Sequence, residues 1–196
     1  MTIKDYSVSQ EDFTLVYDSV LKLYRTTPLP NDLKKYYESE DYISHTDSRR
    51  TLFDKLYQWV KSYNLKHKIK LIKQYKKGNV RLLDIGAGTG DFVRSGKECA
   101  HWETMGIEPS EKARTKAKEK GVLLQADFSN LLPHSFDVIT MWHVLEHVPD
   151  VTQEIQLISN LLKEDGLAVI AVPNYRSWDA QHYGAYWAAY DVPRHL

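Results

Sequence analysis

The chain has 196 residues, which is enough for one domain with a hydrophobic core and a smaller appendage. Its 26 basic and 26 acidic residues cancel, so no overall field attracts nucleic acid or an anionic membrane. The single cysteine, Cys99, excludes an internal disulfide, and no apolar run reaches membrane-spanning length. We therefore expect a cytoplasmic protein with no membrane partner.

The first part of the chain shows little regular patterning. Residues 1–46 are predicted to be a loosely structured lead-in with short strands, and the prolines of TTPLPND (26–32) indicate a turn. Residues 47–77 have apolar side chains at helical spacing, and we expect this helical region to pack on the core. Its second half carries lysines and no acid, which predicts either a solvated face or a surface for an anionic partner.

After Gly78, short apolar runs alternate with amphipathic helices up to residue 173. Continuous apolar strands that alternate with helices are typical of a parallel sheet covered on both faces. We predict an α/β, Rossmann-like, doubly wound parallel sheet with the strand order 3-2-1-4-5. The predicted strands are residues 80–85, 103–108, 121–127, 136–142 and 166–173, and the predicted helices are about 90–99, 110–120 and 150–163.

The motif LLDIGAGTGDF (82–92) closes the first strand and opens a helix. Gly86, Gly88 and Gly90 form G-x-G-x-G, but Asp91 stands where the dinucleotide fingerprint needs its last glycine. A negative charge at a helix start disfavours a pyrophosphate. An acidic glycine-rich loop instead suits a cationic ligand without phosphate, such as S-adenosylmethionine, and argues against a NAD-dependent oxidoreductase.

Acidic residues end the first three predicted strands, at the edge where open α/β sheets bind ligands. They are Asp84, Glu108 and Asp127. Glu108 could take both ribose hydroxyls, Asp127 could accept the adenine amino group, and Phe128 could cover the ring. If these acids only cap local structure, they make no contact with a ligand.

The motifs LDIGAGTGDF, GIEPS, QADF, FDVITMWHVLEHVPD and LKEDGLAVIAVPN occur in this order between about residues 80 and 174. Together they resemble the class I S-adenosylmethionine-dependent methyltransferases, and most closely the branch of the ubiquinone-biosynthesis O-methyltransferases. The resemblance implies S-adenosyl-L-methionine as cofactor, a methyltransferase activity (EC 2.1.1.-) and a doubly wound fold. The cofactor-binding residues that we predict are Asp84, Gly86, Gly88, Gly90, Glu108, Pro109, Asp127, Phe128 and Trp142.

The chain departs from this pattern at both ends. The family fold usually has seven strands, and no room remains for the last two after residue 173, so we expect a truncated chain. Strand 166–173 would then be an apolar edge through which a homodimer could form. The stretch TTPLPNDLKKYYESEDY resembles one that follows a zinc ribbon in relatives, but no cysteine precedes it here. The aromatic tail, residues 174–196, would either line an acceptor site or cap the sheet edge.

Histidines after the fourth strand and in the tail are candidates for a base that helps a hydroxyl acceptor react. We rank His143 first and name His195 second, although each could be purely structural. His143, Glu146 and His147 also form H-x-x-E-H, an inverted zinc-peptidase signature, but Pro149 breaks the long helix that such a site needs.

A metal has one further precedent. The plant small-RNA 2′-O-methyltransferases bind a divalent cation through E-x-x-E-H after the same strand and a distant histidine. Here His143 replaces the first Glu, Glu146 and His147 are kept, and His195 lies downstream as the distant histidine. The replacement weakens the case for magnesium, while zinc or iron would tolerate it. We predict no metal and expect Glu146 and His147 to tie the short helix to its neighbours.

The leading hypothesis is methylation of a small molecule, at oxygen. The alternatives are a protein that binds the donor but cannot catalyse alone, and an RNA methyltransferase that would use the lysine-rich helix. The acceptor, the atom methylated and the oligomeric state do not follow from the sequence.

Overall fold

The structure is a computed structural model that describes residues 1–37 and 52–196. The described residues divide into two compact units. We call the first the core unit; it comprises residues 52–145 and 150–171. The second, the terminal unit, comprises residues 1–37, 146–149 and 172–196. The lead-in and the tail, which are predicted as separate segments, belong to one unit.

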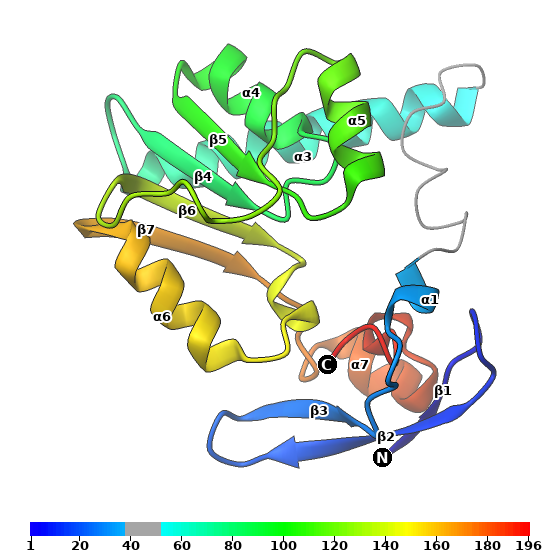
Figure 1. Cartoon of the computed structure of the whole chain (residues 1–196). Helices are drawn as coiled ribbons and strands as arrows, with labels where there is room; N and C mark the ends of the chain where they lie inside the picture. The colour runs from blue at the N-terminus through cyan, green and yellow to red at the C-terminus, as the bar shows by residue number, and fades with distance from the viewer. Residues whose placement is uncertain (38–51) are drawn as a thin grey trace. The chain divides into compact units, whose positions relative to one another are not determined.

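The core unit is built on a parallel sheet with the strand order β5-β4-β6-β7 (Figure 1). This order agrees with four of the five predicted strands. The third predicted strand, residues 121–127, is wrong as a strand: it is reduced to one bridge between Ile107 and Gln125 beside β5. Two backbone hydrogen bonds hold Gln125 there, to Gly106 and Glu108, so the segment still lies at the expected outer edge. The four strands are β4 (Arg81–Ile85), β5 (Glu103–Ile107), β6 (Phe136–Trp142) and β7 (Leu162–Ala171).

Helices connect these strands as βαβ crossovers, and a further long helix, α3, precedes β4. The helices of the core unit are α3 (Leu52–Tyr75), α4 (Asp91–Ala100), α5 (Glu111–Glu119) and α6 (Val151–Leu161). The side chains of Ser110 and Asp150 accept hydrogen bonds from the backbone of the first turns of α5 and α6, as expected for helix caps. Buried Leu82 and Val138 pack with α3 and α4, and the alternate residue Leu83 is buried on the other side of the same strand.

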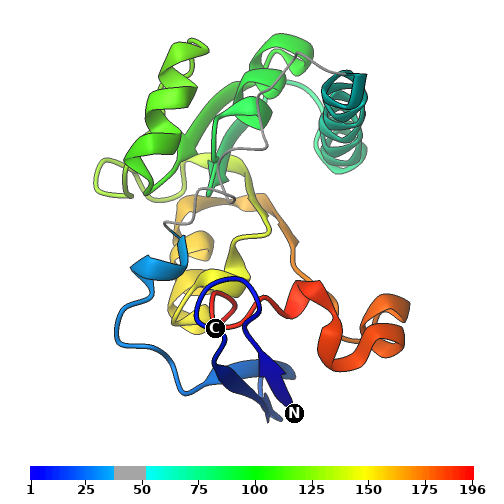
Figure 2. The same cartoon turned by 90° about the vertical axis from the view of Figure 1, so that its right-hand side faces the viewer.

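Helix α3 packs on the core through only part of its length. Ile69 and Ile72 are buried, whereas Trp59 and Tyr63 are 66% and 50% exposed. Figure 1 and Figure 2, which views α3 almost end-on, show that its first turns extend beyond the strands. The second half of α3 therefore packs on the core, whereas the described apolar side chains of its first half are largely exposed.

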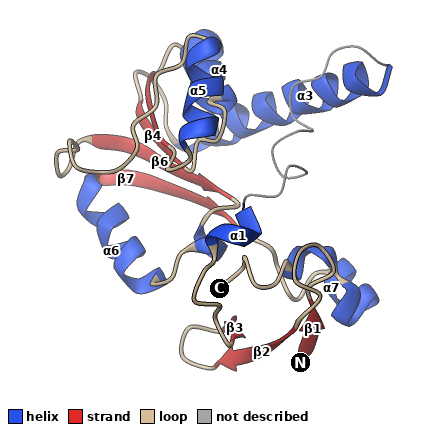
Figure 3. Cartoon of the chain, turned by 45° about the vertical axis from the view of Figure 1, so that its right-hand side comes forward, coloured by secondary structure: helices blue, strands red, loops and turns tan. Residues whose placement is uncertain are grey.

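The terminal unit has a small antiparallel sheet, which corrects the expectation of a loose lead-in (Figure 3). Its strands are β1 (Thr2–Lys4), β2 (Asp12–Asp18) and β3 (Leu23–Thr27), and its helices are α1 (Lys34–Tyr37) and α7 (Trp178–Tyr183). Its apolar cluster joins Phe13 and Leu15 of β2 to Tyr36 of α1 and to Val192 of the tail. The first and last segments of the chain thus share one hydrophobic core.

Strand β7 is an edge of the parallel sheet, as predicted. Its residues range from half-buried to exposed. The predicted homodimer through this edge is not tested by the structure and stays a prediction. Among the described residues no helix is long and apolar enough to cross a membrane. The expected cytoplasmic location also stays a prediction.

Candidate functional site

The glycine-rich loop follows β4 and leads into α4, as the sequence analysis predicted. Gly86 has a φ of +70°, and a Cβ placed on it would lie 2.3 Å from a methyl group of Val144. Gly88 has a φ of +55°, and a Cβ there would meet no atom within 4 Å. The first glycine is therefore required by packing and backbone conformation together, and the second leaves the loop open toward the adjacent cavity.

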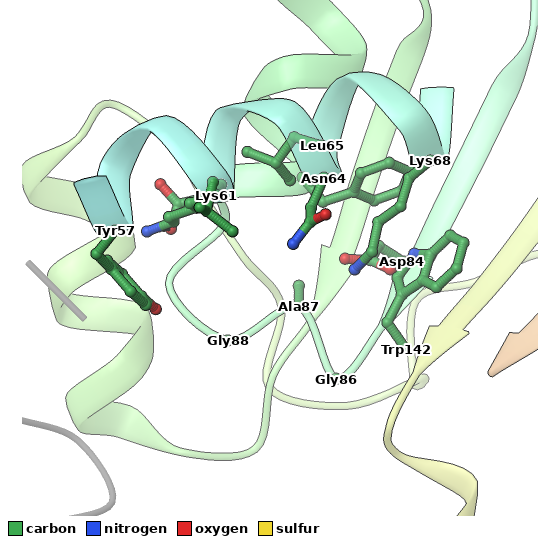
Figure 4. A pocket seen from close by; sticks show the side chains of 13 residues that line it. Tyr57, Lys61, Asn64, Leu65, Lys68, Asp84, Gly86, Ala87, Gly88 and Trp142 are labelled. Atoms are coloured by element: carbon green, nitrogen blue, oxygen red, sulfur yellow. Dashed lines mark ion pairs between the residues drawn. The ribbon is translucent and has the colours of Figure 1, made fainter. Parts of the chain in front are cut away.

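A cavity of about 320 Å³ lies between this loop and α3 (Figure 4). This volume is at the small end of the range found for small-molecule sites. From the sheet side, Asp84, Gly86, Gly88 and Trp142 line it. The residues of α3 that line it are Tyr57, Val60, Lys61, Asn64, Leu65 and Lys68, and Ala87, Asp91 and Phe92 complete the wall.

Asp84 is the most unusual titratable group of the cavity. Its side chain is buried, and the hydroxyl of Thr140 donates a hydrogen bond of 2.6 Å to its Oδ1 atom. Burial raises the pKa of Asp84 to about 7, although the hydrogen bond from Thr140 and the charge of Lys68 act in the opposite direction. A carboxyl group with this pKa changes charge near neutral pH, and a cation placed beside it would favour the ionised form.

Lys68 reaches the cavity from α3 toward Asp84 and Trp142 (Figure 4). Its Nζ atom lies 4.2 Å from the ring centroid of Trp142, within the range of a cation–π interaction. Burial lowers the pKa of Lys68, and Asp84 partly counteracts this. The face of Trp142 and the carboxyl group of Asp84 thus already attract a cation at this point of the cavity.

Trp142 also carries a buried polar atom. Its Nε1 atom has no hydrogen-bond partner among the described residues. The ring packs edge-on against Phe92, with the two ring centroids 5.7 Å apart. A ligand that accepts a hydrogen bond would satisfy this indole N–H.

The negative charge of Asp91 is compensated by two lysines. Its carboxylate lies 2.7 Å from Nζ of Lys61 and 3.4 Å from Nζ of Lys120, and it accepts a hydrogen bond from Thr89. Burial would raise the pKa of Asp91, but the hydrogen bond and the charge of Lys61 outweigh burial and lower it. Lys61 places a positive charge at the start of α4.

Glu108 contacts the glycine loop without lining the cavity. Its Oε2 atom accepts a hydrogen bond of 2.8 Å from the backbone N–H of Gly88, and Oε1 accepts one of 2.9 Å from Ser110. Each carboxylate oxygen retains acceptor capacity after one such bond. Glu108 therefore fixes the loop and could still accept ribose hydroxyls.

The remaining predicted cofactor residues are not brought into the cavity. Gly90 packs against Val122 and Ala117. Pro109 and Asp127 are exposed and Phe128 is half-buried, and none of the three lines the cavity. Asp127 accepts a hydrogen bond from the backbone of Ser129. Their contact with a cofactor stays a prediction.

The two predicted catalytic histidines belong to different units. His143 follows β6, is exposed, has a φ of +59°, and donates a backbone hydrogen bond of 2.9 Å to Ala171. It does not line the cavity. His195 belongs to the terminal unit, where burial and the nearby His147 lower its pKa. The expected catalytic role of either residue is untested.

Sequence reasoning missed the contribution of α3 to the cavity. Tyr57, Lys61, Asn64 and Lys68 lie one helical turn apart or nearly so and point toward the loop (Figure 4). The available signal was the run of lysines without acids, opposite a loop that carries two aspartates. Charge complementarity between these segments would have predicted that they face each other.

The profile of one protein family, described as a methyltransferase domain, matches residues 52–196. The chain belongs to the methyltransferase domain family. This assignment confirms the class I S-adenosylmethionine-dependent methyltransferase resemblance seen in the sequence. S-adenosyl-L-methionine is accordingly the cofactor of the family to which the chain belongs.

Relatives of known name are similar to part of the chain. A ubiquinone biosynthesis O-methyltransferase from Vibrio cholerae is 33% identical over 151 residues, which are 70% of this chain and 57% of that protein. One from Aeromonas salmonicida is 36% identical over 103 residues, which are 48% of this chain and 43% of that protein. The chain thus spans about half the length of these relatives.

Solved structures show the same fold. A SAM-dependent methyltransferase from Archaeoglobus fulgidus is similar with a TM-score of 0.53 and 24% identity, over 68% of this chain and 60% of that one. A SAM-dependent methyltransferase from Thermotoga maritima has a TM-score of 0.51 and 23% identity, over 67% and 63% of the two chains. At this identity the two structures support the fold alone.

The residues of the cavity fit the family's cofactor. S-adenosylmethionine carries a sulfonium and an ammonium group, and the cavity offers the carboxyl group of Asp84 and the face of Trp142. Gly88 leaves room for a ligand to approach the backbone, and the indole N–H of Trp142 lacks a partner among the described residues. The carboxyl group of Asp84 and the face of Trp142 therefore suit a cationic ligand.

Proposed function

We propose that the chain is an S-adenosylmethionine-dependent methyltransferase that acts on a small molecule, with a hydroxyl oxygen as the acceptor. The observation that carries the proposal is the cavity between α3 and the glycine loop, with buried Asp84 at its base. The names of the ubiquinone-biosynthesis relatives, which are O-methyltransferases, support oxygen as the atom methylated. Because the chain spans about half of their length, the activity of the whole protein is part of the proposal.

Bound S-adenosylmethionine supplies a methyl group activated by a positive sulfur. This methyl group would pass to the acceptor oxygen and would leave S-adenosylhomocysteine as the second product. The acceptor proton leaves to a base. The role proposed for the cavity is to hold the donor in line with the acceptor and to exclude water.

Residues in and around the cavity have proposed parts in this. Asp84 and the ring of Trp142 would hold the cationic groups, and Glu108 would accept the ribose hydroxyls while it fixes the loop through Gly88. Lys68 would be displaced from the face of Trp142 when the donor enters, because two cations cannot share that position. His143, at the carboxyl end of β6, is the proposed base.

Methyl transfer itself tests the proposal. The full chain would be incubated with S-adenosylmethionine labelled in the methyl group and with catechol or simple phenols as acceptors. We expect labelled methyl ethers and an equal amount of S-adenosylhomocysteine. The variant His143→Ala should lower the rate by about 10²–10⁴-fold with little effect on donor binding, as expected for loss of a general base.

The second candidate is a protein that binds the donor and does not catalyse alone. The observation that favours this candidate is that His143, the proposed base, does not line the cavity. Donor binding without transfer to phenols, alcohols or amines would favour it over the proposed enzyme.

A further inference from the structure

The terminal unit contains a cluster of ligand-type side chains that the proposed methyl transfer does not use. Glu146, His147 and His195 each offer one ligand atom, and these three atoms lie within 4.8 Å of one another. All three residues are half-buried, and both carboxylate oxygens of Glu146 are inaccessible to solvent. We propose that Glu146, His147 and His195 form a binding site for a divalent transition-metal ion, with zinc as the expected occupant.

Backbone hydrogen bonds fix the tautomers of both histidines. The Nδ1 atom of His147 lies 3.0 Å from the carbonyl oxygen of Arg194, and Nδ1 of His195 lies 2.9 Å from that of Ala189. A carbonyl oxygen can only accept a hydrogen bond, so each Nδ1 atom carries the proton. The lone pair of each neutral ring is then on Nε2, which is available for a metal.

Such hydrogen bonds are typical of metal-binding histidines. The second ring nitrogen of a ligating histidine usually donates to a carbonyl or a carboxylate, which sets the orientation of the ring and raises its basicity. The hydroxyl of Tyr37 adds a further contact, 3.2 Å from Nδ1 of His147, and donates to the carbonyl of Arg194. Both rings are therefore held from behind by neighbouring groups.

The segments that carry the ligands are themselves joined. The backbone N–H of Leu196 donates to the carbonyl of Glu146 at 2.9 Å, and the hydroxyl of Thr26 donates to the carbonyl of His195 at 2.5 Å. The rings of His147 and His195 meet edge to face, with their centroids 4.8 Å apart. The residues that precede α6 and the end of the tail thus approach each other without a metal.

The chemistry of the three ligands indicates the ion. Two imidazoles and one carboxylate suit zinc, iron(II) and related ions better than magnesium or calcium, which prefer oxygen. In a tetrahedral zinc site the ligand atoms lie about 3.3 Å apart, given zinc–ligand distances of about 2.0–2.1 Å. The three side chains would therefore have to close inward by small rotations, and a fourth position would be left for water.

Asp191 has a different part in this region. Its Oδ2 atom lies 3.8 Å from Nε2 of His195, and its Oδ1 atom accepts hydrogen bonds from the guanidinium of Arg194. We assign Asp191 to positioning of the tail segment and not to the ligand set. His143, which the sequence motif had included, lies in the core unit and is not part of the cluster.

Metal binding by the full chain tests the proposal. The protein would be stripped with a chelator, dialysed and titrated with zinc chloride by calorimetry, and bound zinc would be counted by mass spectrometry. We expect one zinc ion per chain. The variants Glu146→Gln, His147→Ala and His195→Ala should each weaken zinc binding by at least about tenfold. The variant His143→Ala, which keeps the cluster intact, should bind zinc as tightly as the wild type.

Two spectroscopic measurements keep the test independent of variants that fail to fold. Cobalt(II) added to the wild type should give the intense visible bands of a low-coordinate site, and zinc should displace them. Nitrogen-15 NMR of the metal-free wild type should show His147 and His195 with the proton on Nδ1, and zinc should shift the Nε2 resonances. The proposal would be overturned if the folded wild type bound neither zinc nor cobalt. It would also be overturned if His143→Ala weakened zinc binding as much as the three ligand variants do.

Discussion

At the scale of single residues, Asp84 links the fold to the chemistry. It is the fourth residue of β4, so the strand that positions the glycine loop also buries this carboxyl group. Thr140 of β6 holds one of its oxygens, and Lys68 of α3 lies on the cavity side. This carboxyl group, which can be neutral or anionic near pH 7, therefore lies at a cavity whose other walls are the glycine loop, one face of α3 and aromatic rings.

The raised pKa of Asp84 predicts a pH-dependent affinity for S-adenosylmethionine. The cationic donor should bind the ionised form, which is the minor form below the pKa of about 7 and the major form above it. Affinity should therefore fall about tenfold between pH 8 and pH 6. Loss of the proton from Lys68, whose pKa is lowered by burial, acts in the same direction. Calorimetry at several pH values measures this dependence.

The variant Asp84→Asn separates the two groups. It should bind the donor more weakly and lose most of the pH dependence, whereas a dependence that persists would belong to Lys68. An affinity of the wild type that rises toward pH 6 would contradict the assignment of Asp84 to the cationic part of the ligand.

The free-energy cost of a side chain at Gly86, in the glycine loop, can be measured against Gly78, which lies outside the loop and serves as the control. Both have positive φ, at +70° and +81°, but only a Cβ at Gly86 meets Val144. Gly86→Ala should lower the free energy of unfolding by about 1–3 kcal/mol more than Gly78→Ala, because crowding is added to the same backbone strain. Urea denaturation compares the two. Equal effects would mean that Val144 moves away without cost.

At the scale of elements, the sequence predicted the βαβ units. It did not predict that the third strand would be reduced to one bridge or that the first half of α3 would be exposed. The run GVLLQAD was apolar enough to predict a strand, but Leu123 is 80% exposed and only Gln125 bridges to β5. In α3, the apolar spacing continued past the end of the sheet, so periodicity identified the helix without showing where its partner stopped. Neither outcome could be read from local patterns, because both depend on how far β5 and the sheet extend.

The two halves of α3 are expected to respond differently to truncation of side chains. Ile72 is fully buried against the sheet, whereas Trp59 is 66% exposed. Ile72→Ala should lower the free energy of unfolding by about 2–5 kcal/mol. Trp59→Ala should change it by about 0.5 kcal/mol or less. Chemical denaturation of both variants measures these values, and a large loss for Trp59→Ala would show that its half of the helix is covered in solution.

At the scale of the whole molecule, sequence reasoning predicted the core unit and failed for the terminal unit. The motifs of the core lie close together in the chain, and their order alone indicates the fold. The terminal unit instead joins β2 to α1 through the contact of Phe13 with Tyr36, and both to the tail through the cluster that they share with Val192. Contacts between the two ends of a chain leave no local periodicity, so the sequence offered Glu146, His147 and His195 only through the likeness to a metal motif of other methyltransferases and did not show that these side chains meet.

The charge of the whole chain bears on RNA as an acceptor. Net charge is zero, and three lysines of the basic helical segment already interact with other residues. Lys61 pairs with Asp91, Lys76 pairs with Asp165 at 2.6 Å, and Lys68 lies over Trp142. We expect no binding of a short single-stranded or duplex RNA at physiological salt, measured by fluorescence anisotropy. Salt-sensitive binding that is lost when Lys66, Lys70 and Lys73 are replaced by Gln would contradict this.

The central claim is that the cavity between α3 and the glycine loop binds S-adenosylmethionine, and calorimetric titration of the full chain with this donor tests it most directly. We predict one binding site per chain, at least about tenfold weaker in Asp84→Asn and unchanged in His182→Ala, a histidine of the terminal unit that stacks on Trp178. A folded wild-type chain that binds neither S-adenosylmethionine nor S-adenosylhomocysteine would contradict the account, as would equal affinity in wild type and Asp84→Asn.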